Sequence, residues 1–179
     1  MKHWLKFVIG WVAVFAIQFL PFRPPNVEPV LAAQMPFAKR FGWFGGFFFG
    51  FTSIALYDLL AGRVGVWTWV TAGMFGLLGI LAFLFFKKRK AEPKNFLVCA
   101  VFGTLLYDAV TGLTIGPLFF GQSFMGALVG QIPFTLYHLV GNVVFSLVVS
   151  PLAYRWIVEN ESLETDAILE KIALGYSGR

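Results

Sequence analysis

Residues 64–86 read VGVWTWVTAGMFGLLGILAFLFF and contain no charged side chain. An apolar run of about 20 residues crosses the hydrocarbon core of a bilayer as a helix. The run is continuous rather than alternating, which argues against a strand of a membrane barrel. It ends at KKRKAEPK (87–94), a strongly basic stretch that is typical of a solvated loop. This region therefore predicts a transmembrane helix that stops at a basic loop.

The composition of the whole chain indicates the same class. Of its 179 residues, 58% are hydrophobic and 13% are charged, and the mean hydropathy is +0.76. Soluble domains carry about 25% charged residues. The one cysteine, Cys99, has no partner for an internal disulfide and is expected to pack as a small apolar residue. We therefore predict an all-α integral membrane protein with a single transmembrane domain.

Working outward from residues 64–86, we predict six transmembrane helices. Prolines end or interrupt helices, and they mark the first break after residue 20. The second helix is short and broken by Pro29 and Pro36, and the last is expected to bend near Pro133 and Pro151. The predicted spans are Trp4–Leu20, Val27–Ala38, Phe41–Ala61, Val64–Phe86, Asn95–Gly112 and Gln122–Ile157.

Lysine and arginine set the orientation, because they are enriched in cytoplasmic loops. Six spans with both termini cytoplasmic leave twelve of the 14 basic residues inside and two outside, Arg23 and Arg63. The span Val27–Ala38 covers only about 18 Å of a ~30 Å core. If it does not cross, five spans with the N-terminus outside leave eleven inside and three outside. We predict the six-span arrangement.

The domain organisation follows from this topology. A transmembrane domain covers residues 1–158, and a polar cytoplasmic tail covers 159–179. The N-terminal MKHWLK with its apolar run also resembles a signal peptide, although no A-x-A cleavage site follows. Because topology accounts for the net charge of +5, no nucleic-acid partner is expected.

Two related stretches lie 50 residues apart: ALYDLLAG at 55–62 and LLYDAVTG at 105–112. Their similarity suggests that helices 3–4 are repeated as helices 5–6. Both acids, Asp58 and Asp108, would then lie about four residues, or ~6 Å, from the outer ends of their helices. An acid facing lipid costs about 2.5–3.5 kcal/mol at a helix centre. We expect both acids at the outer rim of one cavity; alternatively, they bond only to neighbouring helices.

Other polar side chains are predicted at the same outer end or on the last helix. Gln131, Thr135, His138 and Asn142 follow at steps of four, three and four, which places them on one face of a helix. This stripe should turn inward, either toward a ligand or toward neighbouring helices. The candidate binding residues are Asn26, Glu28, Tyr57, Asp58, Arg63, Trp67, Tyr107, Asp108, Gln122, Gln131, His138 and Asn142.

Within this set, the acids would act as acceptors, Arg63 as an anion partner and Trp67 as a stacking face. Gln131 and His138 would form the floor. The five outer charges considered, Glu28, Asp58 and Asp108 with Arg23 and Arg63, sum to −1. That balance favours a polar, neutral or mildly cationic solute. Trp67 could instead serve only as an anchor at the membrane interface.

Motifs for catalysis and energy coupling are missing from the sequence. It contains no GxxxxGK[ST] phosphate loop, no HExxH, no GxSxG and no Cys/His cluster. We therefore expect neither catalytic residues, nor a cofactor, nor a metal site, and we do not expect an enzyme.

The layout of residues 4–157 resembles the substrate-binding S component of energy-coupling-factor (ECF) vitamin transporters. The segment PPNVEPVLA and the helix end YDLLAG are the most suggestive stretches. The resemblance implies binding of a vitamin-like solute from outside, with a transmembrane T component and two cytoplasmic ATPases as partners. It also implies the cytoplasmic membrane of a bacterium or archaeon. Such proteins often carry Ala-x-x-x-Ala on the first helix for the T component; here Gly10, Ala13 and Ala16 are spaced by three.

Two other functions remain open from the sequence. In a structural or assembly membrane protein, the two acids would only pair helices. In an intramembrane aspartyl protease, Asp58 and Asp108 would share a proton. The tyrosine before Asp58 fits presenilin-like enzymes, but their Gly-x-Gly-Asp signature is missing from GTLLYD.

Overall fold

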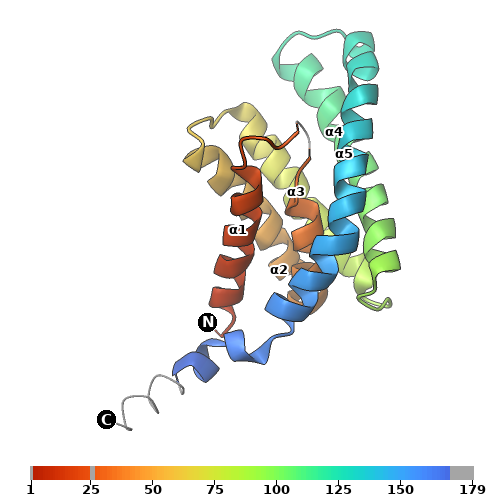
Figure 1. Ribbon diagram of the computed structural model, residues 1–179. Helices are drawn as coiled ribbons and strands as arrows, with labels where there is room; N and C mark the ends of the chain where they lie inside the picture. Colours follow the sequence, from red (N-terminus) through yellow and green to blue (C-terminus); the bar gives the residue numbers. More distant parts are fainter. Residues whose placement is uncertain (1, 25–26, 170–179) are drawn as a thin grey trace.

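The computed structural model describes residues 2–24 and 27–169, and every regular element within them is a helix. The α-helices are α1 (Trp4–Gln18), α2 (Val30–Leu60), α3 (Val66–Phe86), α4 (Pro93–Phe119) and α5 (Phe124–Ala153). A π-helical segment, η1 (Tyr154–Val158), continues α5, and a short 3-10 helix, η2 (Glu161–Leu163), follows. The helices lie side by side in one elongated bundle (Figure 1).

Four of these helices have the length and composition of membrane spans: α2, α3, α4 and α5 continued through Val158. Helix α1 is apolar but has only 15 residues. Large apolar side chains cover the outside of the bundle, and Phe102 on α4, for example, is 69% exposed. An apolar exterior of this kind suits contact with lipid rather than water. The predicted all-helical class is therefore confirmed.

Helix α2 reverses direction at Gly42, where the backbone is non-helical (φ 78°, ψ −172°). In a continuous helix, residues 34 and 46 would lie about 18 Å apart. Instead, the side chain of Gln34 donates a hydrogen bond to the carbonyl of Gly46 at 2.9 Å. The element is thus a hairpin with arms 30–41 and 43–60, which correspond to the second and third predicted helices.

The prolines of the first arm do not break it, contrary to the sequence prediction. Pro29 stands at the N-cap of α2, and Pro36 lies inside the helix. A proline has no N–H and cannot bond the carbonyl four residues earlier, which here is Ala32. The hydroxyl of Ser150 on α5 donates a hydrogen bond to the Ala32 carbonyl at 2.7 Å. A side chain from a distant helix thus satisfies the group that proline leaves unpaired.

Small residues let the second arm of α2 approach α3 closely. A Cβ atom added at Gly46 would lie 2.7 Å from the carbonyl oxygen of Gly79. The fully buried Gln34 also donates to the carbonyl of Phe75 on α3 at 2.6 Å. Close backbone contact at glycines is the usual way in which apolar helices associate in membranes.

Basic residues gather at the end of the bundle where the described chain begins and ends. The ammonium group of Lys39, next to the α2 reversal, donates to the carbonyls of Phe86 and Arg89 at 2.9 Å each. Arg40 pairs with Glu159 at 3.4 Å. The α2 reversal, the α3–α4 loop and the segment after α5 therefore share one end of the molecule.

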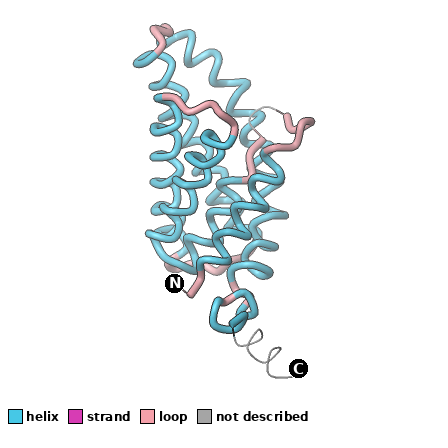
Figure 2. The backbone as a smooth tube through the Cα atoms, turned by 90° about the vertical axis from the view of Figure 1, so that its left-hand side faces the viewer, coloured by secondary structure: helices cyan, strands magenta, loops and turns pink. Residues whose placement is uncertain are grey.

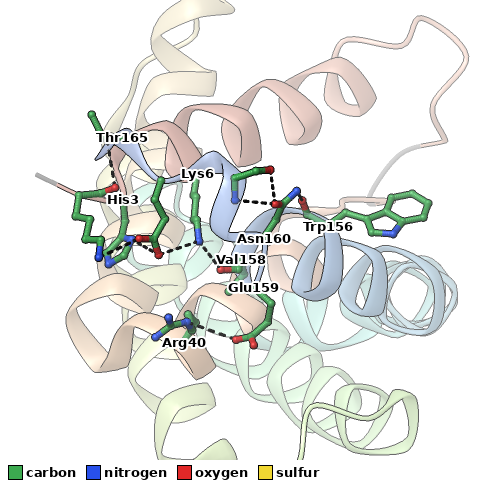
Figure 3. Close-up of polar contacts among 11 residues, drawn as sticks. His3, Lys6, Arg40, Trp156, Val158, Glu159, Asn160 and Thr165 are labelled. Carbon is green, nitrogen blue, oxygen red and sulfur yellow. Dashed lines mark hydrogen bonds and ion pairs between the residues drawn. The ribbon is translucent and has the colours of Figure 1, made fainter. Parts of the chain in front are cut away.

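The same end holds the beginning and the close of the described chain together (Figure 3). The buried Lys6 of α1 donates to the carbonyl of Val158 at 2.9 Å. Glu164 pairs with Lys2 at 3.1 Å, and residues 165–169 are helical. The start of the predicted polar tail thus packs against α1, and residues 170–179 lie outside the described part.

Helix α4 is longer than predicted and continues seven residues past Gly112, to Phe119. Asp108 is therefore eleven residues from the end of its helix, whereas Asp58 is two residues from the end of α2. The expectation that both acids lie about four residues from a helix end is wrong. The extra turns make the α4–α5 connection project beyond the other loops (Figures 1 and 2).

Candidate functional site

The end of α2 explains the spacing of YDLLAG. Gly62 has a positive φ of 66°, and its N–H bonds the carbonyl of Leu59 at 3.2 Å. The N–H of Arg63 bonds the carbonyl of Asp58 at 3.0 Å. These two bonds form the Schellman motif, which ends helices at a glycine. The motif folds Arg63 back over the last turn, onto Asp58.

Asp58 is almost fully buried, and both of its carboxylate oxygens have partners. Arg63 donates through Nε to Oδ1 at 2.9 Å, and the hydroxyl of Thr68 on α3 donates to Oδ2 at 2.6 Å. The guanidinium of Arg63 also lies 4.5 Å from the centroid of the Tyr57 ring. The sequence suggested separate roles for Asp58 and Arg63 toward a ligand, but the two side chains are paired with each other.

A polar cavity of about 250 Å³ opens beside this pair. Its lining residues include the last residue of α1, residues near the end of α2 and residues near the start of α3. Six predicted residues line it: Glu28, Tyr57, Asp58, Arg63, Trp67 and Tyr107. Gln18, Ile54 and Thr71 complete its wall. Residues from four helices and from the segment before α2 thus meet at one cavity.

Gln18 is the residue that sequence reasoning missed. Its side chain is 3% exposed, and among the described residues neither its amide nitrogen nor its amide oxygen has a hydrogen-bond partner. The hydroxyl of Tyr57 donates to the backbone carbonyl of Gln18 at 3.3 Å, not to its side chain. The available signal was a single amide, in FAIQFL, at the end of an otherwise apolar helix.

Trp67 and Tyr107 form the aromatic part of the cavity wall. The ring of Trp67 lies 6.2 Å from that of Phe120, which immediately follows α4. The projecting end of α4 therefore reaches toward the cavity from the side. The hydroxyl of Thr71 is held by its own helix, because it donates a hydrogen bond to the carbonyl of Trp67 at 2.8 Å.

Asp108 does not line this cavity. Of the two acids expected at one cavity, only Asp58 lies in its wall. The Oδ1 atom of Asp108 lies 2.7 Å from Nδ1 of His138 on α5, and both side chains are buried. Its second carboxylate oxygen is buried and has no hydrogen-bond partner in the described chain. The Tyr107 ring, which does line the cavity, packs edge-on against His138 at 5.6 Å.

The predicted stripe on the last helix does face inward, toward α4. Asn142 is buried and donates to the hydroxyl of Thr104 at 2.9 Å. Together with the His138–Asp108 pair, this bond joins α4 to α5. Gln131, higher on the stripe, is half-buried and donates to Thr135 at 3.2 Å.

The remaining predicted residues lie elsewhere. Gln122 is exposed beside Gly116, and Asn26 lies outside the described residues. On α1, Ala13 and Ala16 are exposed, whereas Gly10 is buried against Phe37. Gly10 therefore belongs to the interior rather than to an outer face.

The arrangement of acids bears on the chemistry that the site can support. Asp58 and Asp108 line different cavities and bond to different partners, unlike a pair of carboxylates that shares one proton. Within residues 2–24 and 27–169, no three His, Cys, Asp or Glu side chains come together as metal ligands. The geometry is that of a small cavity whose wall holds polar groups that no described residue pairs.

Comparison with known proteins identifies no relative: no family model, no curated protein and no solved structure matches the chain.

Proposed function

We propose that the chain is the membrane-embedded, substrate-binding subunit of an ECF-type importer, and that it takes a small solute into the Gln18–Asp58 cavity from outside. The observation that carries this proposal is the cavity itself, of about 250 Å³, with the buried and unpaired amide of Gln18 in its wall. Concave sites with a few convergent polar groups are the usual form of small-molecule sites.

The proposed topology has six crossings and cytoplasmic termini. It counts α1, the two arms of α2, α3, α4 and α5 as the crossing segments. The bond between Lys6 and Val158 supports an even number, because it joins the start of α1 to the end of η1. The basic groups at that end would be cytoplasmic, and the cavity with Arg63 would face outward.

Energy would come from partners, because the sequence has no phosphate-binding loop. The resemblance to S components suggests a transmembrane T component and two cytoplasmic ATPases in a bacterial or archaeal cytoplasmic membrane. Ala13 and Ala16, exposed on α1, offer small side chains that allow another helix to approach.

The test combines ligand recovery with partner capture. The full chain is purified in mild detergent from cells that express the partner subunits, denatured, and the released small molecules are identified by mass spectrometry. Ile54→Trp, which fills the cavity, is the matched control. We expect the wild-type chain to release a solute that the variant lacks, and both chains to retain the ATPases. Release of no solute by the wild-type chain, together with no captured ATPase, would overturn the proposal.

A further inference from the structure

Most polar groups around the cavity already have partners within the protein. Asp58 accepts from Arg63 and Thr68, so both of its oxygens are used. Arg63, in turn, is held by Asp58 and by the face of the Tyr57 ring. Because their opposite charges offset each other, neither Asp58 nor Arg63 is a free counter-charge for a ligand.

Two groups in the same wall are unpaired in the described chain. Gln18 presents an amide N–H₂ and an amide oxygen, both buried without a hydrogen bond. Glu28 is half-buried and has neither a hydrogen bond nor an ion pair to any described residue. A buried amide destabilises a fold unless something bonds to it. A bound solute would satisfy this amide, and it would also meet the free carboxylate.

The charges of the cavity favour one class of solute. Its wall carries two carboxylates, Glu28 and Asp58, and one guanidinium, Arg63, which leaves a net charge of −1. An anionic group would face Glu28 with no free cation beside it, whereas an N–H group would gain a charge-assisted hydrogen bond. The aromatic side chains of Trp67 and Tyr107 suit a flat, apolar part of the solute.

We infer that the cavity selects a small planar solute, neutral or singly cationic, which donates N–H to Glu28 and offers a donor and an acceptor to the Gln18 amide. Gln18 is then a specificity-determining residue. This inference rests on the proposed solute-binding function and adds the class of ligand. A site built to hydrogen-bond its substrate rejects analogues that leave its polar groups unpaired.

The experiment compares matched probes that differ in one substituent. The full chain in detergent is dialysed to equilibrium against a defined mixture of five- and six-membered heteroaromatic rings. Each ring is present as the aminomethyl, the carboxamide and the carboxylate compound, and enrichment on the protein is measured by mass spectrometry. We expect aminomethyl or carboxamide compounds to be enriched about tenfold or more over the matching carboxylates.

Variants assign the selection to the two residues. Gln18→Leu removes a buried amide that no described residue pairs, so it should not impair folding, and it should abolish carboxamide enrichment. Glu28→Gln should abolish the preference for aminomethyl compounds over carboxylates. Thr135→Val, outside the cavity, should retain the wild-type pattern.

The outcomes separate the inference from the proposed function. Preferential enrichment of carboxylates, or an unchanged pattern in Gln18→Leu, would overturn the inference and leave solute binding intact. Enrichment of no compound by the wild-type chain, combined with no released solute in the recovery experiment above, would overturn both.

Discussion

The two stretches YDLLAG (57–62) and YDAVTG (107–112) look alike in sequence but behave differently in the fold. At the first, Gly62 adopts a positive φ and ends α2, which brings Arg63 onto Asp58. At the second, Gly112 remains helical and α4 continues to Phe119. A side chain at Gly112 would collide with Gln131 of α5. One glycine therefore ends a helix, and the other leaves room for a side chain of the neighbouring helix.

The consequence for the two acids is a difference in their partners. Asp58 stands at the wall of an open cavity and is neutralised by a half-exposed arginine. Asp108 is buried between α4 and α5, with His138 as its only hydrogen-bond partner among the described residues. The first acid lies in a cavity wall, and the second joins α4 to α5.

The largest effect is expected from His138→Ala. Removing one partner of this buried hydrogen bond costs about 1–3 kcal/mol, because the carboxyl group of Asp108 stays buried without a partner. The expected loss is measured as the free energy of unfolding in detergent. The double variant Asp108→Asn/His138→Gln should recover part of this loss. Full stability of His138→Ala would contradict the role assigned to the pair.

A smaller contrast is expected between the two glycines. Gly62→Ala should cost about 1 kcal/mol, because alanine disfavours a positive φ. Gly112→Ala should cost less, because only the flexible end of the Gln131 side chain has to move and alanine favours a helix. Unfolding measurements on both variants test the comparison. Equal losses in the free energy of unfolding would contradict the different roles assigned to the two glycines.

Arg63→Ala is expected to change selectivity more than stability. The side chain of Arg63 is half-exposed, so its pair with Asp58 contributes about 0.2–1 kcal/mol. The charge around the cavity would change from −1 to −2, which should raise the preference for cationic solutes. Binding of aminomethyl and carboxamide probes measures this change. The equivalent loss of charge far from the cavity, Lys88→Ala, provides the control.

The smallest effect on the two acids and on the cavity is expected from the Lys2–Glu164 ion pair, which lies at the opposite end of the bundle. Hydrogen bonding to Lys2 lowers the pKa of Glu164, so this contact is present above about pH 4.5 and is lost as the pH falls through the lowered pKa. The pKa of Lys2 is raised by the same contact, which is lost again as the pH rises through that raised pKa. The loss of the Lys2–Glu164 contact at low pH is measured with an environment-sensitive probe attached near residue 2. Glu164→Gln should remove this transition. Probe binding in the cavity at neutral pH should be unchanged.

Much of the secondary structure could be predicted from hydropathy, but several boundaries could not. The helical segments and the basic loop at 87–94 follow from runs of apolar and charged residues. Pro36 was expected to break a helix and does not. Ser150 donates to the carbonyl of Ala32, the group that Pro36 cannot pair. The reversal occurs instead at Gly42, within a run, FGWFGG, whose glycines do not show in advance which one will turn.

The candidate site was predicted in part. Six of its residues were chosen for polarity and for position near a helix end, and both properties can be seen in a linear sequence. Gln18 was missed because its value lies in what surrounds it: burial with no partner, beside a free carboxylate. Asp108 was assigned to the wrong cavity because α4 was expected to end at Gly112.

The sequence was sufficient to establish a helical membrane protein with basic residues gathered at one end. Those properties depend on local composition, because a bilayer requires each span to be apolar and to bond its own backbone. The partners of the two acids depend on contacts between distant residues. His138 lies 30 residues from Asp108, and the Gln18 carbonyl meets Tyr57 across 39 residues. Such contacts follow from how helices pack, so two nearly identical stretches acquired different roles only in the folded bundle.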